Sequence, residues 1–318
     1  MSKCKKTSIG GQALIEGIMM KGPEKTVIAV RNKEKEIELV DVPEKHLKDK
    51  YKFFGLPVIR GVVNFIEAMI QGYKALMISA DKSGMTDLEE DKEKTEKQEK
   101  KESILISAVM LIGSVLGVLL SVFLFMYIPS LLFDGLSLLF SGKLSDAIRP
   151  IFEGVVKIMI FVGYVAAVSK MNDIKRVFMY HGAEHKAIFC YEKGLELTVE
   201  NVRREKRFHP RCGTSFMILM LVVGILINLL IVTLFPAVTK LRILWVLVKI
   251  LMLPFICGLG YELIRFCGRH DNWLTKMVSA PGLWVQRLTT KEPEDDMLEV
   301  AIESLKAVIP EDTEKDRW

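Results

Sequence analysis

Four long apolar stretches constrain this chain more than any other feature of its sequence. They cover residues 103–133, 150–169, 214–239 and 241–264, and the first and third contain no charged residue. About 20 consecutive apolar residues suffice to cross a bilayer as a helix. The sequence therefore predicts an all-α polytopic membrane protein with about four transmembrane helices, together with a small N-terminal β-hairpin and cytoplasmic or interfacial helices.

Composition supports this class and argues against others. Half of the 318 residues are hydrophobic, and the charged residues lie in blocks between the apolar stretches. The formal net charge is only +5, and basic runs are not interleaved with aromatic residues, so we expect no nucleic-acid partner. We also expect no cleavable signal peptide, because Gln12 and Glu16 interrupt the first apolar stretch. The lipid bilayer is the partner that the sequence predicts.

Basic residues predict the orientation of the spans. The segment 170–213 carries ten Lys and Arg residues, whereas Lys143 and Arg149 are the only ones between the first two spans. Segments rich in Lys and Arg stay on the cytoplasmic side. We therefore expect residues 170–213 and both termini to lie in the cytoplasm.

The polar segments complete the predicted organisation. It comprises an N-terminal cytoplasmic or interfacial segment (1–80), a charged linker (81–102), transmembrane helices 1 and 2 (103–169), a cytoplasmic metal-site loop (170–213), transmembrane helices 3 and 4 (214–264), and a C-terminal cytoplasmic or interfacial tail (265–318).

Within the N-terminal segment we expect one hairpin and one helix. Residues 26–40 alternate between apolar and polar around a polar turn, which predicts a β-hairpin. Residues 56–80 are apolar except for one stripe at helical spacing, so this helix should lie in the membrane interface or against the bundle. The stripe consists of Arg60, Asn64, Glu67, Gln71 and Lys74.

Two features follow the last span. Trp273 and Trp284 lie among apolar residues and indicate an interfacial segment. Residues 294–296 are all acidic and should open a short amphipathic helix, since acids are stabilised at a helix N-terminus.

His181-Gly-Ala-Glu-His185 is the motif with the clearest chemistry. In a helix His181 and His185 stand one turn apart on one face, so both imidazoles can reach one metal ion, and Glu184 could act as a general base. The order H-x-x-E-H is also that of inverted zinc-protease motifs. The alternative is that both histidines are solvated or capping side chains.

His209-Pro-Arg-Cys212-Gly strengthens the metal interpretation. Three of the five histidines fall in segment 170–213, with two of the five cysteines, whose spacings suggest free thiols or metal ligands rather than disulfides. Imidazole and thiolate favour zinc. Four protein ligands (His181, His185, His209 and Cys212) would make the zinc structural, and three with an open position would make it catalytic. Glu184 has no use in a closed site and favours catalysis.

Other polar residues allow two interpretations each. Glu16 is surrounded by apolar residues, so it should reach the metal or a basic residue, unless it caps a turn. Lys249 in the fourth span should extend its ammonium outward, and the alternative is a buried pair with Glu153. The few polar residues inside the spans do not indicate an ion path, so transport is the weakest hypothesis.

Four motifs carry a resemblance to a known family. GGQALIEGIMMKGP, HGAEHKAIFCYE, HPRCGTSF and APGLWVQRLTTKEP resemble the bacterial YqhQ-like family, described as predicted metal-dependent membrane proteins of unknown function. The resemblance covers nearly the whole chain outside the charged linker. It implies a multi-pass protein of the bacterial cytoplasmic (inner) membrane with a metal site at His181, His185, His209 and Cys212, but it implies no reaction.

The sequence therefore leads to one main hypothesis and one alternative. The first is a membrane metalloprotein, zinc-dependent and a hydrolase, with Glu184 as the general base. The alternative is a membrane scaffold or accessory protein in which a His/Cys zinc site only stabilises the cytoplasmic loop. The sequence predicts neither a substrate for the hydrolase nor an oligomeric state for the protein.

Overall fold

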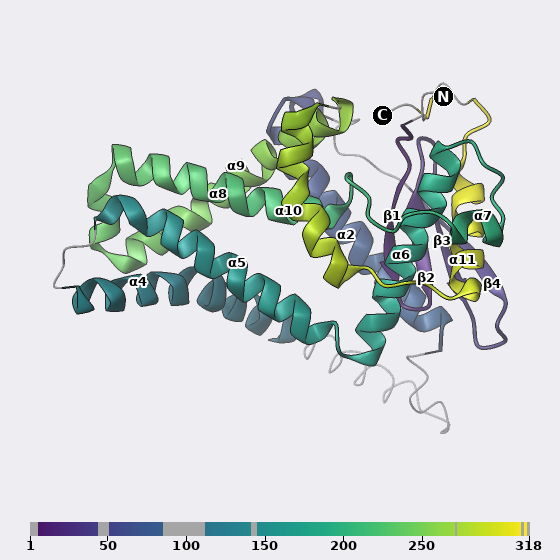
Figure 1. Cartoon of the computed structure of the whole chain (residues 1–318), viewed down its shortest axis with the longest axis horizontal. Coiled ribbons are helices and arrows are strands. Elements are labelled where there is room, and N and C mark those ends of the chain that lie inside the picture. The colour runs from purple at the N-terminus through teal and green to yellow at the C-terminus, as the bar shows by residue number, and fades with distance from the viewer. Residues whose placement is uncertain are drawn as a thin grey trace. The chain divides into compact units, whose positions relative to one another are not determined.

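The computed structural model describes residues 6–43, 51–84, 112–140, 145–270, 272–312 and 315–316 (Figure 1). Most of these residues are helical, and there is one small antiparallel sheet. The chain forms two compact units. Unit 1 comprises residues 1–86, 164–220 and 254–318, and unit 2 comprises residues 87–163 and 221–253. Helices α5 (Arg149–Val168), α8 (Gly213–Leu234) and α9 (Arg242–Arg269) contribute to both units.

The sheet of unit 1 has four strands in the order β1-β2-β3-β4, all antiparallel. The predicted hairpin is confirmed as β3 (Thr26–Arg31) and β4 (Ile37–Val42). Two further strands, β1 (Gly10–Leu14) and β2 (Gly17–Lys21), extend the sheet. They were not predicted, because β2 is almost wholly apolar and buried and so shows no alternation with polar residues.

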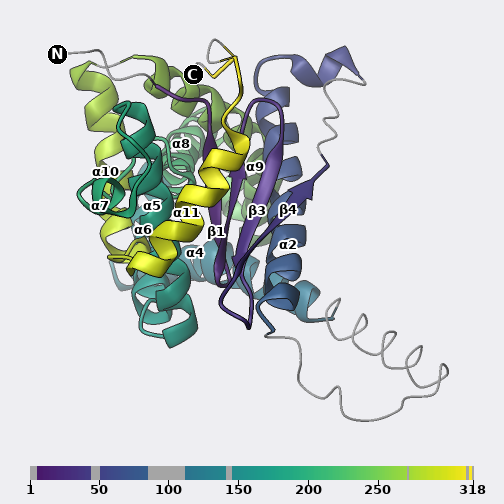
Figure 2. The same cartoon turned by 90° about the vertical axis from the view of Figure 1, so that its right-hand side faces the viewer.

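Helices cover both faces of the sheet, as Figure 2 shows. Helices α6 (Asn172–Glu192) and α11 (Asp295–Val308) share one buried cluster with the sheet, which includes Ile18 and Val27. On the opposite face, Met19 and Ile28 pack with Ala75 of α2 (Ile59–Lys82). Successive strand residues point to opposite faces, so this short meander has two apolar faces and both are buried.

Helix α2 buries small residues and exposes large apolar side chains, which is the reverse of a typical helix in a soluble protein. Its buried residues are mainly small, namely Gly61, Val63, Gly72, Ala75 and Ser79. Arg60 in its polar stripe pairs with Glu262 of α9, with Nε–Oε1 2.6 Å. Large apolar side chains face outward instead, among them Ile66, Met69 and Tyr73. The predicted helix is confirmed, and its exposed face is apolar.

Segment 170–213, the predicted metal-site loop between the second and third spans, contains two helices. Helix α6 occupies most of it, the short helix α7 (Val199–Arg203) follows, and residues 204–212 lead to α8. After α9 comes α10 (Trp273–Thr289), which starts with a capping box at Asn272. The predicted acidic helix start is confirmed in α11, which has Asp295 and Asp296 in its first turn.

Four helices are long and apolar enough to cross a membrane: Ile112–Leu139, Asp146–Val168, Gly213–Leu234 and Arg242–Arg269. Each corresponds to one predicted span, and the fourth runs through Pro254 and continues past Ile264 to Arg269. The first contains η2 (Phe123–Tyr127), a π-helical turn, followed by α4 (Ile128–Leu139). Residues 103–111 of the predicted first span and 85–102 of the predicted linker lie outside the described residues.

Within unit 2, Lys249 of α9 is buried rather than directed outward. Its Nζ lies 2.8 Å from Oε2 of Glu153 on α5, and the two side chains are 2% and 1% exposed. Trp245 Nε1 donates a second hydrogen bond to Glu153, at 2.9 Å. The prediction that Lys249 extends outward was therefore wrong, because a buried carboxylate on a neighbouring helix stabilises its charge.

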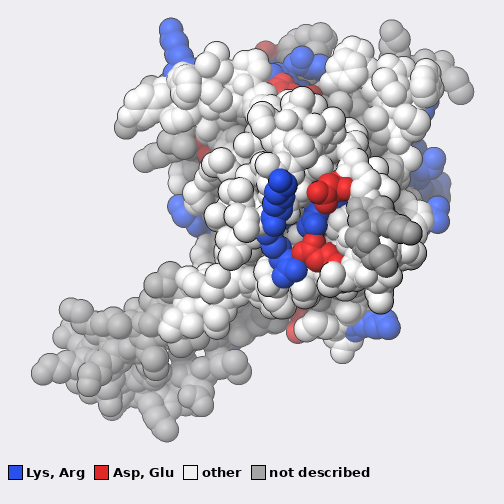
Figure 3. Space-filling model, turned by 90° about the vertical axis from the view of Figure 1, so that its left-hand side faces the viewer, with Lys and Arg blue, Asp and Glu red and all other residues white. Residues whose placement is uncertain are grey.

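Charged side chains are sparse on some surfaces of the molecule. In Figure 3, among the described residues of one face, white atoms predominate over the blue and red ones, and the blue and red atoms near the centre form one small group.

Candidate metal centre

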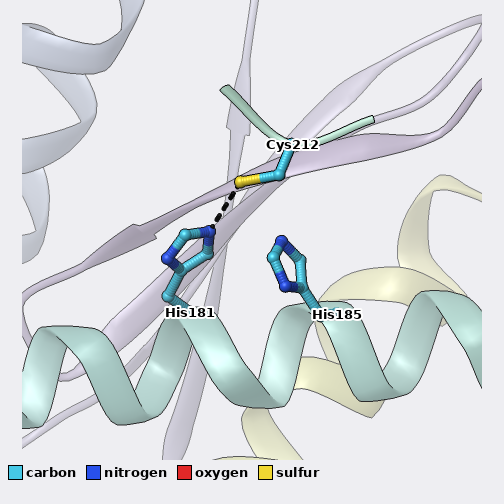
Figure 4. Close-up of side chains that lie close together, drawn as sticks. All are labelled: His181, His185 and Cys212. Carbon is cyan, nitrogen blue, oxygen red and sulfur yellow. Dashed lines mark hydrogen bonds between the residues drawn. The ribbon is translucent and has the colours of Figure 1, made fainter. Parts of the chain in front are cut away.

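Helix α6 brings the two motif histidines to one face, as predicted. His181 and His185 are one turn apart, with their ring centroids separated by 4.4 Å. Cys212, from the turn before α8, lies opposite them (Figure 4). The candidate ligand atoms of these three residues all lie within 4.8 Å of one another, and His181 Nε2 is 3.1 Å from Cys212 Sγ.

Backbone carbonyls orient both imidazoles. His181 Nδ1 lies 2.9 Å from the carbonyl oxygen of Thr289, and His185 Nδ1 lies 2.5 Å from that of Arg207. A carbonyl oxygen only accepts, so each Nδ1 carries a proton, and Nε2 is the ring atom left for a ligand. Histidine ligands of metals are usually oriented in this way by a hydrogen bond from the second nitrogen.

The Nε2 atom of His185 is the clearest sign of a missing partner. It is buried, and within the described part of the chain it has no hydrogen-bond partner. Buried polar atoms without a partner are rare in folded proteins, because removing them from water costs free energy. A metal ion bound by His181, His185 and Cys212 would supply that partner, so these residues fit one.

The charges within this group favour a thiolate. Burial alone would raise the pKa of Cys212, but the facing imidazoles of His181 and His185 hold it well below the usual value for a thiol. Burial would lower the pKa of His181, and the charge and hydrogen bond of Cys212 raise it to about 9. The thiolate is the form of cysteine that binds metals.

Gly182 allows the segment after α10 to reach the centre. A Cβ atom at this position would lie 2.2 Å from the carbonyl oxygen of Lys291. The backbone N–H of Lys291 donates to the Phe178 carbonyl, so this segment runs directly across α6. That close approach places the Thr289 carbonyl on His181, and any larger residue at 182 would move it away.

Glu184 lies on α6 between the two histidines and faces β1. Its side chain is buried, and a Cβ atom on Gly11 would come within 3.0 Å of its Cδ. Burial raises the pKa of Glu184, although His185, His181 and a hydrogen bond from the Gly11 backbone oppose this. Gly11 of the first motif thus makes room for the carboxylate of the second.

His209 is not in the group formed by His181, His185 and Cys212, although its ring centroid is 5.6 Å from that of His185. Its buried Nε2 lies 3.7 Å from Glu192 Oε2 and, like that of His185, has no hydrogen-bond partner in the described part of the chain. Burial is the main cause that lowers the pKa of His209, to about 4, so its imidazole is neutral at neutral pH. Its role as a fourth ligand stays a prediction.

Glu16 belongs to a different contact. It forms a two-pronged ion pair with Arg176 of α6 (Nε–Oε1 2.5 Å), and it accepts a hydrogen bond from Tyr180. The Arg176 guanidinium holds the pKa of this carboxyl below its usual value. Of the alternatives considered for Glu16, the structure supports the basic partner. For the sequence pair His270-Asp271, which follows the fourth span, we expected contact with lipid headgroups, with support of the metal site as the alternative. His270 is exposed, and Asp271 lies outside the described residues.

Sequence reasoning did not identify the residues that support the site. Gln286 of α10 is fully buried; its Oε1 accepts from the His209 N–H and its Nε2 donates to the His209 carbonyl. It therefore fixes the turn that carries Cys212. Gln286 and Thr289 both lie in the motif APGLWVQRLTTKEP, whose place in the resemblance was the available signal.

Two imidazoles and one thiolate form a donor set suited to zinc. Three protein ligands would leave one tetrahedral position open, which is the arrangement of catalytic rather than structural zinc sites.

Comparisons with known proteins agree with the motif resemblance. A family model described as "Protein of unknown function (DUF1385)" matches residues 56–311. The chain is also 37% identical over 313 residues to "Uncharacterized protein YqhQ" of Bacillus subtilis (strain 168), with 94% of this chain and 92% of that protein covered. No solved structure matches the chain significantly.

Proposed function

Since the chain belongs to the DUF1385 family of proteins of unknown function, we propose that it is an integral membrane zinc protein with a hydrolytic site formed by α6, the turn at Cys212 and β1. The four apolar helices would be the membrane spans, and the centre would lie on the cytoplasmic side of a bacterial cytoplasmic membrane.

Outward-facing apolar side chains support the membrane assignment. Leu138 of α4 and Ile243 and Leu251 of α9 are each more than 70% exposed. Large apolar side chains exposed in such numbers on long helices are expected where a protein contacts lipid or another protein. Alkaline phosphatase fused after Ser141 should be active, and a fusion after Lys193 should be inactive. The opposite pattern would contradict the proposed orientation.

One observation carries the metal assignment. Among the described residues the buried Nε2 of His185 has no hydrogen-bond partner, while the Nδ1 on the same ring is held by the Arg207 carbonyl and Cys212 lies opposite. A histidine that serves only packing would not keep its free lone pair directed at a buried thiolate. Zinc supplies that partner, and we assign His181, His185 and Cys212 as its ligands.

Glu184 is the group that favours hydrolysis. A zinc ion bound here would act as a Lewis acid and increase the acidity of water. Glu184 would accept the proton of the attacking water at its carboxylate and later return it to the leaving group. The Gly11 N–H holds this carboxylate in place, and burial raises its pKa, which makes it a better base.

A structural zinc site is the second candidate, and burial favours it. His185 is 1% exposed, Glu184 is 5% exposed and Cys212 is 8% exposed. Zinc in such a site would tie α6 to the turn before α8 without reacting with any substrate. His209 is the nearest candidate for a fourth ligand.

The variant Glu184→Gln distinguishes a hydrolytic zinc site from a structural one. The variant keeps the size and most of the hydrogen bonding of Glu184 but cannot accept a proton near neutral pH. For a hydrolase, we expect it to bind about one zinc per chain and yet fail to restore function to a deletion strain. Cys212→Ser should also fail, but with loss of the metal. Zinc content and complementation are the two measurements.

Glu200→Gln is the matched control, because Glu200 is an exposed acid on α7 outside the centre. It should complement fully. If Glu184→Gln complements as well while Cys212→Ser does not, the zinc is structural and the hydrolase proposal is wrong. All variants must reach the membrane at the abundance of the parent protein.

A further inference from the structure

A second concave region of unit 1 lies outside the metal centre. It is a cavity of about 560 Å³ between the C-terminal end of α9, one face of α10 and segment 208–211. Four basic side chains contribute to its lining, namely Lys6, Arg211, Lys276 and Arg287, and none of its described lining residues is acidic. Cationic concave surfaces concentrate anions, because field lines converge in them.

The basic residues differ in whether an acidic group of the protein already balances their charge. Arg211 forms an ion pair with Glu192, so its charge is partly balanced. The ammonium of Lys6 donates to the Gly268 carbonyl at 2.8 Å, which leaves its charge uncompensated by that contact. Arg287 is exposed and forms no hydrogen bond or ion pair within the described part of the chain. Its five N–H donors are therefore available to an anion.

The remaining wall of the cavity is apolar and aromatic. It includes Phe208 and Trp284, and Trp284 is 54% exposed. Trp273, at the start of the same helix, is 75% exposed. Exposed tryptophans next to basic residues are typical of the headgroup region of a membrane, where one side of the ring is apolar and the other is wet. The cavity thus combines sites for a negative charge and for a hydrocarbon chain.

We propose that this cavity binds the phosphate group of an anionic amphiphile, with Arg287, Lys276 and Lys6 around the phosphate and Trp284 and Phe208 along the apolar part. A phospholipid headgroup or a free phosphate could supply the shared chemistry, and the apolar wall favours the lipid. The proposal depends on the membrane insertion proposed above but not on the metal.

The experiment uses the full-length protein purified in a neutral detergent. Phosphatidylglycerol and phosphatidylcholine are titrated separately and bound lipid is counted by native mass spectrometry, with inorganic phosphate as a competitor. We expect phosphatidylglycerol to bind more tightly than phosphatidylcholine. Removal of two basic residues in Arg287→Gln/Lys276→Gln should weaken phosphatidylglycerol binding roughly 25-fold, from about fivefold for each charge near a headgroup.

Lys175→Gln/Arg204→Gln is the matched control, because it removes the same charge from exposed positions outside the cavity. It should bind phosphatidylglycerol like the parent protein. Competition by inorganic phosphate would show that the phosphate alone is bound, and a lack of competition would show that the acyl chain is also needed; both support the cavity as the site.

The proposal is overturned if the two lipids bind equally, or if the control variant loses as much affinity as the cavity variant. Zinc content, measured on the same samples, should not change in either variant. Loss of lipid binding with zinc retained therefore separates this site from the metal centre.

Discussion

Each unit of this protein buries a group of polar side chains, and the two groups differ in how their atoms are paired. In unit 2, Glu153 accepts hydrogen bonds from both Lys249 and Trp245, and the Lys249 ammonium also donates to the Met126 carbonyl at 3.3 Å. In unit 1, two imidazoles face the Cys212 thiol, and the His185 Nε2 atom has no partner in the described structure.

The difference separates a structural pair from a binding site. In the Lys249–Glu153 pair each charged group has a partner within the chain, so the pair requires no ligand, and its main physical effect is to penalise any arrangement that separates the charges. Met126 lies within the π-helical turn η2, which contributes a carbonyl to Lys249. By contrast, an imidazole that is oriented through Nδ1 but unpartnered at Nε2 is organised for an ion that is not part of the chain.

The largest effect should come from separating the pair in unit 2. Lys249→Met leaves Glu153 buried without its counter-charge, and breaking a buried pair in this way costs about 3–5 kcal/mol. The double variant Lys249→Met/Glu153→Gln removes both charges and should recover most of that stability. Thermal unfolding in detergent measures both effects.

The exposed pair Lys82–Glu38 offers a control, since loss of a surface ion pair has little effect on stability. If Lys249→Met unfolds at the same temperature as the parent protein, the Glu153 cluster does not hold unit 2 together. The buried Lys249–Glu153 pair would then not be a structural element of unit 2.

A smaller effect is expected from removal of metal in unit 1. A ligand that binds only the folded protein adds about 2.7 kcal/mol of stability when its free concentration is 100 times its dissociation constant. A chelator should therefore lower the unfolding temperature of the parent protein and leave that of Cys212→Ser unchanged.

Lys249→Met/Glu153→Gln should keep the full response to the chelator, because its changes lie in the other unit. An equal response to the chelator in Cys212→Ser and in the parent protein would show that the metal binds elsewhere. The His181, His185 and Cys212 cluster would then not be a metal site, and it would no longer differ from the Glu153 cluster in needing a ligand.

Local patterns predicted the elements that local interactions determine. The four apolar stretches correspond to four helices because their length and composition suffice for that structure. The spacing of His181 and His185 placed both rings on one face of α6, since residues four apart are neighbours on any helix. The acids at 294–296 marked the start of α11 for the same local reason.

Contacts between distant segments were not accessible to such patterns. Strand β2 shows no alternation because helices cover both faces of the sheet, and that depends on where α2 and α11 pack. Gln286 lies 77 residues from His209 along the chain, yet it forms two hydrogen bonds with that backbone. Nothing near residue 286 in the sequence reveals this partner.

The amino-acid sequence alone was enough to predict the four long apolar helices, helix α2, the start of α11 and the side chains that could bind zinc. Tertiary structure alone decided that Cys212 lies opposite His181, that Lys249 pairs with Glu153, and that Glu16 pairs with Arg176. The physical reason is that helix formation depends on residues a few positions apart, whereas the partner of a buried charge or lone pair depends on which surfaces pack together.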